Sequence, residues 1–237
     1  GYGELAEEFA KVRSDFDFVG IKRSGCSQLA NVNMVNCDYS LGLPEQVTKN
    51  NYDWVIFFPK TSGNSPDDYK IGYLSQMTAI NDHFPSAKKI FISSTRIYSG
   101  YSNIIVDENT PPKPSDEQGE IIELYESEAL KHGNNFVLRL GGLITHKSNF
   151  VKLVLDKQLF LDNKYINGIF ISDVINLMAK IMQEGIGQQL INVIMPKYMK
   201  YSDFDSAFKG EPINAAVKSI HYNDEAKFKI KTIRELA

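Results

Sequence analysis

The sequence predicts an α/β protein in which helices cover both faces of a mostly parallel β-sheet. Two observations support this fold class. Short apolar strands alternate with amphipathic helices along the chain, and turn residues separate them. The 237 residues suffice for one large core. We therefore expect a single domain over residues 1–237, in which the shorter, more loosely connected elements of 142–170 and 195–237 form a small C-terminal lobe.

Hydrophobic periodicity defines the elements of the first half of the chain. Leu5, Phe9 and Val12 repeat at helical spacing. The uninterrupted apolar run 54–58, stopped by Pro59, is typical of a strand buried on both faces. In chain order we predict a helix at about 4–14, strands at 16–21, 32–37 and 54–58, a loop rich in Gly, Ser and Pro at 61–66, and a helix through Ile71, Leu74, Met77 and Ile80 that Pro85 closes.

The same patterns continue in the second half. Ile121, Tyr125 and Ala129 mark the inner face of a helix, and Ser172 is a candidate N-cap for a later one. In chain order we predict a strand at 89–93, a helix at 116–132, a strand at 136–140 ended by Gly141 and Gly142, a helix through Val174, Leu177, Met178 and Ile181, and a strand at 190–194.

Composition excludes several classes of function. The chain has 26 basic and 29 acidic residues, a net charge of −3, and no cluster of Lys and Arg, so we expect no nucleic-acid partner. No apolar run reaches the ~20 residues of a membrane span and no signal peptide opens the chain, which predicts a cytoplasmic protein without membrane contact. Cys26 and Cys37 lack metal or redox spacing and are interpreted as small core or near-core residues. The four histidines are too scattered for a metal site.

The first six residues form a GxGxxA motif that runs directly into the first predicted helix. In such a motif Gly1 permits a tight turn, Gly3 lets the backbone approach a pyrophosphate, and Ala6 lets the helix pack closely. The N–H groups of Glu4 and Leu5, at the helix N-terminus, would face the anion. The motif therefore predicts a dinucleotide site in a doubly wound Rossmann fold; the alternative is a flexible, glycine-bearing N-terminus.

A strand normally precedes this motif, yet the sequence begins at its first glycine. We expect that roughly five to eight strand residues belong upstream of Gly1, an estimate taken from ordinary strand lengths. Without such a strand the sheet would lack its centre.

The residues after the second predicted element distinguish NAD from NADP. An acid there binds the ribose 2′-OH, whereas an arginine accommodates a 2′-phosphate. Lys22, Arg23 and Ser24 supply two cations and a hydroxyl, with no acid. The sequence favours NADP, with NAD as the alternative; Lys22 and Arg23 could equally be solvated loop charges.

Later segments add a further pattern. They are Asp38, Phe57-Phe58-Pro59, the strand end Ile92–Tyr98 with its serine pair, Leu138–Leu143, Gly168–Val174 and Ile191–Val193. In order and spacing they resemble the extended short-chain dehydrogenase/reductase family, in particular its atypical NAD(P)-dependent epimerase/dehydratase-like branch. The resemblance covers nearly the whole chain. It implies that Asp38 contacts the adenine, that Phe57, Phe58 and Pro59 line the cofactor, and that Ser93 contacts the cofactor or the backbone.

The resemblance also implies a catalytic hydroxyl, a tyrosine base and a lysine that lowers the pKa of that tyrosine. Ser94 matches the hydroxyl position, but matching Pro114-Ser115 and Gly119 to the family places Gln118 at the tyrosine and Ile122 at the lysine. No lysine in the chain has a tyrosine four residues before it. Since a free tyrosine has a pKa of about 10, we expect the family's ordinary acid–base chemistry to be crippled.

Three other places in the sequence offer side chains that could replace the lost acid–base groups. Glu117 could serve as a carboxylate base or simply complement the helix dipole. Tyr98 could present its phenol to a substrate or form a wall of the cleft. His146 and Lys147 follow the segment that passes over the substrate in the family, but they are as readily explained as surface loop.

Two functions therefore remain open. One is an NADP-dependent reductase or epimerase acting on a small molecule, such as a nucleotide sugar, with non-standard acid–base groups. The other is a catalytically inactive dinucleotide-binding sensor or partner subunit. Whether the chain is an enzyme, and whether it forms a homodimer, the sequence leaves open.

Overall fold

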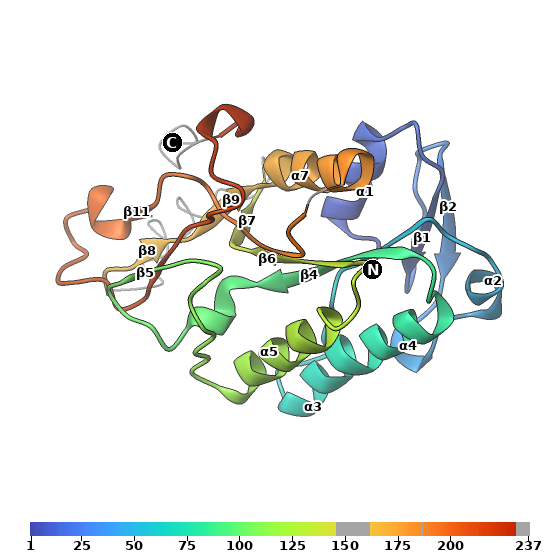
Figure 1. The fold of residues 1–237 in the computed structure, drawn as a ribbon, viewed down its shortest axis with the longest axis horizontal. Coiled ribbons are helices and arrows are strands. Elements are labelled where there is room, and N and C mark those ends of the chain that lie inside the picture. Colours follow the sequence, from blue (N-terminus) through green and yellow to red (C-terminus); the bar gives the residue numbers. More distant parts are fainter. Residues whose placement is uncertain (146–161, 186, 231–237) are drawn as a thin grey trace.

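The fold of the 237-residue chain is seen in a computed structural model, which describes residues 1–145, 162–185 and 187–230. Figure 1 shows three layers: helices α1 (Glu4–Val12) and α7 (Ile171–Glu184) lie on one side of the central strands, and helices α3, α4 and α5 lie on the other. This layering is the one expected when apolar strands alternate with amphipathic helices.

The central sheet has four strands in the order β10-β6-β4-β3, all parallel. Their bounds are β3 Trp54–Phe57, β4 Lys88–Ser94, β6 Asn135–Leu140 and β10 Leu190–Val193. Every residue of β6 is buried, as a strand covered on both faces requires. Since the strands are parallel, their carboxyl ends share one edge of the sheet.

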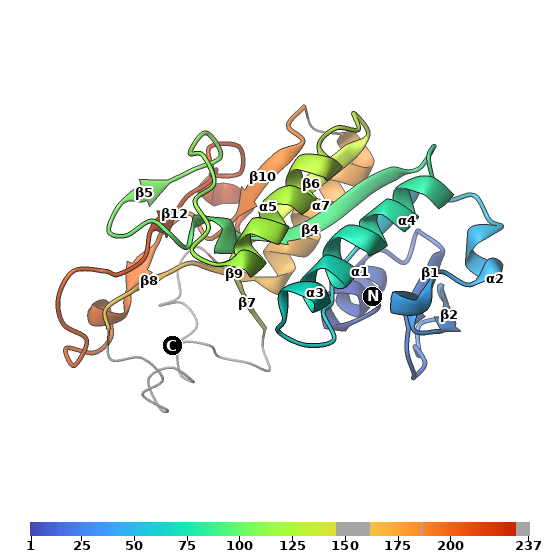
Figure 2. The same ribbon diagram turned by 90° about the horizontal axis from the view of Figure 1, so that it is seen from below.

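Two further strands form a separate parallel pair. Strand β1 (Phe18–Lys22) bonds to β2 (Val32–Asn36), and neither belongs to the four-stranded sheet. Figures 1 and 2 place this pair at the opposite end of the molecule from β5 (Ile105–Val106) and β8 (Tyr165–Ile166). Among the described residues, no ladder joins β1 to β3.

The helices cover both faces of the strands with apolar side chains. One large cluster joins α1 and α7 to the sheet, and its fully buried members include Phe9, Phe170 and Met178. A second cluster joins β3, β4 and β6 to helices α4 and α5, with Phe91 and Tyr125 inaccessible to solvent. The helix bounds on this side are α2 Glu45–Thr48, α3 Pro66–Tyr69, α4 Gln76–His83 and α5 Glu117–Ala129.

Short strand pairs gather at the other end of the molecule. They are β5 (Ile105–Val106) with β12 (Ala216–Val217), β7 (Gly142–Ile144) with β9 (Gly168–Phe170), and β8 (Tyr165–Ile166) with β11 (Met199–Lys200). In Figure 2 strands β5, β8 and β12 lie away from the main sheet. They fall largely within the predicted C-terminal lobe, whose separate status stays a prediction and part of which lies outside the described residues.

The predicted α/β class and nearly all predicted elements are confirmed, with two local corrections. Ser172 is not an N-cap, because α7 already begins at Ile171 and Phe170 is the capping residue. The helix predicted through Ile71 is confirmed, and a π-helical segment over 70–75 joins α3 to α4 within it. Cys26 is exposed and not a core residue; it lies in the polar loop after β1.

Candidate functional site

The opening residues lie where the carboxyl ends of β1 and β3 converge. The nitrogen of Gly1 donates to the carbonyl of Phe58, 3.2 Å away, just past the end of β3. The next backbone N–H, that of Tyr2, donates over 2.7 Å to the carbonyl of Ile21 in β1. These two bonds place the glycine motif at the carboxyl edge, between neighbouring strand ends, which is where open α/β sheets bind ligands.

Helix α1 begins within the motif, at Glu4. Gly3 is the capping residue in an extended conformation, and it has no side chain that could cap the helix. A Cβ added at Gly3 would have nothing within 4 Å, so open space lies in front of the helix. Such an end suits an anion. Glu4 is exposed, whereas Leu5 is buried, so Leu5 has only its backbone to offer a ligand.

The strand ends next to the motif carry charged groups. Lys22 closes β1, and Arg23 and Ser24 follow it at the surface. Asp38, after β2, is exposed and accepts hydrogen bonds from the backbone and hydroxyl of Ser40, which lower its pKa, with a smaller contribution from the charge of Arg23. The structure thus brings Arg23 and Asp38 near one another at the carboxyl edge.

The end of β3 contributes backbone groups, more than side chains, to the carboxyl edge of the sheet. Phe57 is buried against Phe91 and Tyr125, so its ring faces the core. Phe58 offers the carbonyl that holds Gly1, and Phe58 and Pro59 are half-buried. Among these three residues, Phe58 and Pro59 lie at the edge itself.

Ser94 ends β4 and caps the short 3₁₀ helix over 95–98. Its hydroxyl accepts the backbone N–H of Arg96 at 3.2 Å, and its side chain is half-buried. Arg96 turns toward the start of α5, where its guanidinium lies 2.7 Å from a carboxylate oxygen of Asp116. This contact holds the pKa of Asp116 below its ordinary value.

The residues at the two positions matched to the family's tyrosine and lysine make contacts of a different kind. Gln118 accepts a 2.5 Å hydrogen bond from Arg96 and donates from its amide nitrogen to the backbone carbonyl of Asn64, in the loop after β3. Ile122 is 1% exposed and packs in an apolar cluster with Ile97 and Tyr98. Gln118 therefore ties two loops together, and Ile122 brings no cation.

A buried polar chain runs beneath this edge. Ser93 donates to Glu126 of α5, and Glu126 pairs with Arg139 of β6 at 2.6 Å, with both charged side chains under 5% exposed. Arg139 also donates over 2.7 Å to the hydroxyl of Tyr98. Burial raises the pKa of Glu126, and the Arg139 guanidinium opposes that effect. Ser93 is therefore engaged with the core, beneath the open edge.

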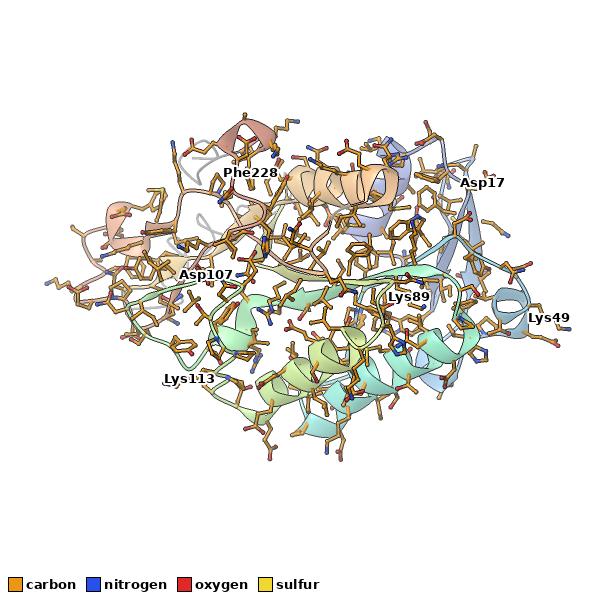
Figure 3. The ribbon with its side chains drawn as sticks, in the orientation of Figure 1. Asp17, Lys49, Lys89, Asp107, Lys113 and Phe228 are labelled. Carbon is orange, nitrogen blue, oxygen red and sulfur yellow. The ribbon has the colours of Figure 1, made fainter. Side chains whose placement is uncertain are left out.

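Tyr98 and Glu117 occupy very different surroundings. Tyr98 is 2% exposed, and its hydroxyl donates to the carbonyl of Asp107 at 2.8 Å; Figure 3 labels Asp107 beside the short-strand end of the molecule. Burial raises the pKa of Tyr98, the reverse of what a base near neutrality requires. Glu117 is exposed at the first turn of α5. Their catalytic roles stay predictions, and His146 and Lys147 lie outside the described residues.

Sequence reasoning missed Arg96, Asp116 and the Glu126–Arg139 pair. Arg139 did carry a signal, since it is a charge inside the otherwise apolar run 136–140 and a buried charge needs a partner. Arg96 carried none, because its contact with α5 spans 20 residues and depends on how the chain folds back.

With this geometry in place, comparison with solved structures decides the fold. A dTDP-glucose 4,6-dehydratase from Bacillus anthracis str. Ames, in complex with NAD, matches with a TM-score of 0.76 over 98% of this chain and 92% of that chain, at 13% identity. The fold is the Rossmann fold. At such low identity the likeness to these NAD-dependent enzymes establishes the fold alone.

Two other Rossmann structures agree. ADP-L-glycero-D-manno-heptose-6-epimerase from Helicobacter pylori gives a TM-score of 0.70 at 15% identity, over 93% of this chain and 85% of that chain. UDP-glucuronic acid 4-epimerase from Bacillus cereus, in complex with NAD, gives 0.67 at 13% identity, over 93% and 87%. No family model and no curated protein matches the sequence.

Among the described residues, no helix has the length and apolarity to cross a membrane. Within the same residues, no three His, Cys, Asp or Glu side chains are grouped so as to hold a metal ion.

The buried pair gives a first prediction. Replacing Arg139 by Met should lower the free energy of unfolding by about 3–5 kcal/mol, because the Glu126 carboxylate is left buried without its counter-charge. Urea denaturation measures the loss. The double variant Glu126→Gln/Arg139→Met, which removes both charges, should recover most of it; an unchanged single variant would show that the pair does not stabilise the fold.

Proposed function

We propose that the chain binds a nicotinamide dinucleotide at the amino end of α1, with NADP preferred over NAD. The observation that carries this proposal is the amino end of α1, where the capping residue Gly3 has no side chain and a Cβ added to it would meet no atom within 4 Å. Backbone N–H groups and the helix dipole there favour a diphosphate. The neighbours crystallised with NAD support the same class of cofactor.

The residues at the carboxyl edge fit such a cofactor. Gly1 and Gly3 would admit the pyrophosphate, with the N–H groups of Glu4 and Leu5 behind them. Lys22, Arg23 and Ser24 would hold the 2′-phosphate, and Asp38 would meet the adenine. Phe58 and Pro59 would bound the cofactor at the end of β3, with Phe57 supporting them from the core and Ser93 supporting the β4 end from below. Such a cofactor supplies hydride transfer when bound.

A small-molecule substrate, of the nucleotide-sugar class, is the best-supported partner for an active protein. The structurally similar proteins include enzymes that are named for nucleotide sugars. In this proposal Ser94, at the carboxyl end of β4, hydrogen-bonds the reacting oxygen of the substrate. Glu117, the exposed carboxylate next to Gln118 at the start of α5, is the candidate base.

An inactive sensor or partner subunit is the second candidate, and Gln118 and Ile122 favour it. Gln118 cannot ionise, and its amide is engaged with Arg96 and Asn64. Ile122 is enclosed by apolar side chains. A protein with these groups retains dinucleotide binding without the usual proton transfer, which contributes ~10²–10⁴-fold to rate.

Gly3→Ala separates binding from folding. The added methyl has no protein atom within 4 Å, so the thermal midpoint should not change, but it projects into the space proposed for the pyrophosphate. We expect the affinity for NADPH, measured by calorimetry, to fall at least tenfold. Gly133→Ala, a methyl in open space at the turn between α5 and β6, is the matched control. Unchanged affinity in Gly3→Ala would exclude this site.

Arg23→Ala tests the preference for NADP. A charge-assisted hydrogen bond to phosphate contributes about 1.5–3 kcal/mol, so binding of NADPH should weaken about 10–100-fold while binding of NADH stays constant. Titration calorimetry with both cofactors measures this. Lys11→Ala, at the far end of α1, is the charge-matched control. Equal losses for NADPH and NADH would refute the 2′-phosphate assignment.

Ser94→Ala distinguishes the enzyme from the sensor. With nucleotide sugars as substrates and NADPH absorbance as the readout, turnover by the unmodified chain should fall about 10²-fold in the variant. Ser86→Ala, in the exposed turn before β4, is the control. Tight NADPH binding without any turnover would favour the sensor instead.

A further inference from the structure

Arg96 lies next to the serine proposed to bind the reacting oxygen, and the proposed function gives it no role. It belongs to the 3₁₀ turn that Ser94 caps, and its backbone N–H donates to the Ser94 hydroxyl at 3.2 Å. Its guanidinium reaches the first turn of α5, beside Gln118, the residue matched to the family's tyrosine. The side chain is 36% exposed, so a ligand can reach it.

The guanidinium of Arg96 is held on one edge and free on the other. Its Nε lies 3.4 Å and its Nη2 2.7 Å from the carboxylate of Asp116, and Nη2 also donates to the side chain of Gln118 at 2.5 Å. These bonds use three of the five N–H groups that an arginine offers. Among the described residues the two N–H groups of Nη1 have no acceptor, so two charged donors remain for a ligand.

An aromatic ring supports the guanidinium from one side. The central carbon of the group lies 5.9 Å from the centroid of the Tyr69 ring, and that ring is stacked on Tyr73 with 5.5 Å between the centroids. Tyr69 ends α3, and Figures 1 and 2 show α3 and α5 side by side. Because contacts from both helices hold Arg96, little side-chain freedom is left to lose when Nη1 binds an anion.

The carboxylate of Asp116 is shared between Arg96 and the end of a helix. Asp116 is the N-cap of α5 and accepts the backbone N–H of Gly119 at 2.8 Å. The dipole of α5 favours a negative group at this end. The hydrogen bond that Arg96 donates to Asp116 raises the pKa of Arg96, so the guanidinium is always charged. An anion at Nη1 therefore meets a permanent cation whose counter-ion is also engaged with α5.

The position of Arg96 beside Ser94 indicates which part of a sugar it would meet. In a nucleotide sugar the diphosphate is attached at C1, across the ring from C4. When Ser94 binds an oxygen on C4, the diphosphate points away from the turn that carries Arg96, and the substituent on C5 is the nearest one. That substituent is a neutral hydroxymethyl group in a hexose and a carboxylate in a hexuronate. A fixed guanidinium favours the carboxylate.

We propose that Arg96 is a specificity-determining residue that selects a nucleotide sugar with a carboxylate on the carbon next to the reacting one, as in a uronic acid. Nη1 donates to that carboxylate, while Asp116 and Gln118 hold the guanidinium in place. Gln118 thereby has a positioning role where the family has its tyrosine. The inference rests on the proposed function and narrows the substrate class named there.

Titration calorimetry with UDP-glucuronate and UDP-glucose tests the proposal, because the two compounds differ only at C6. No dinucleotide is added, so the result is independent of cofactor binding. We expect the unmodified chain to bind UDP-glucuronate about 10–100-fold more tightly, the range of one charge-assisted hydrogen bond. Arg96→Gln should abolish this preference and leave the affinity for UDP-glucose unchanged. Arg96→Lys, which keeps a cation, should retain part of the preference.

Two further variants separate contact with the ligand from other effects of Arg96. Lys113→Gln removes an exposed charge from the loop before α5, labelled in Figure 3, and should leave the preference unchanged. Asp116→Asn keeps a good N-cap but no longer competes for the guanidinium, so the preference for UDP-glucuronate should rise. If Arg96 served only to tie the 3₁₀ turn to α5, Asp116→Asn would reduce binding as Arg96→Gln does.

Three outcomes would overturn the proposal and leave the nucleotide-sugar class intact. They are equal binding of the two compounds by the unmodified chain, an equal loss of both affinities in Arg96→Gln, and a reduced preference in Asp116→Asn. Absence of binding of either compound would refute the nucleotide-sugar class itself, and this inference with it.

Discussion

The arrangement of the molecule depends on two backbone hydrogen bonds at the start of the chain. Through them Gly1 and Tyr2 hold the ends of β3 and β1 at the same place, although no ladder joins those strands. The bonds also set the direction in which α1 leaves the sheet, with its amino end at the carboxyl edge. The geometry of the proposed diphosphate site therefore depends on how the β1–β2 pair packs beside the four-stranded sheet, although no ladder joins the two sheets.

A second constraint organises the far side of that edge. Glu126 and Arg139 bring opposite charges into the core, and each is satisfied by a neighbour, Ser93 or Tyr98. These four side chains come from α5, β4, β6 and the 3₁₀ segment, so the network fixes how α5 lies on the sheet. Side chains committed to this network are poorly placed for chemistry, since moving them would expose a buried charge. The open groups, Ser94 and Glu117, lie outside it.

The proposed function follows from a division between these two regions. The part of the edge near α1 is open, rich in backbone donors and flanked by Lys22 and Arg23. The part near α5 is occupied, because Gln118 bridges Arg96 and the loop at Asn64. Cofactor binding needs mainly the first region, whereas proton transfer needs the second. Dinucleotide binding is accordingly supported more directly than turnover.

The sequence by itself determined the α/β class, the order of strands and helices, and the glycine motif ahead of α1, because apolar periodicity and glycine spacing are local properties. Only the tertiary structure decided that Ser93 and Tyr98 are buried partners of Glu126 and Arg139, that Arg96 meets α5, and that Cys26 is exposed. Those contacts join residues that are distant in the chain. Their energies depend on how deeply the side chains are buried and how closely they come together, and no local sequence pattern encodes either quantity.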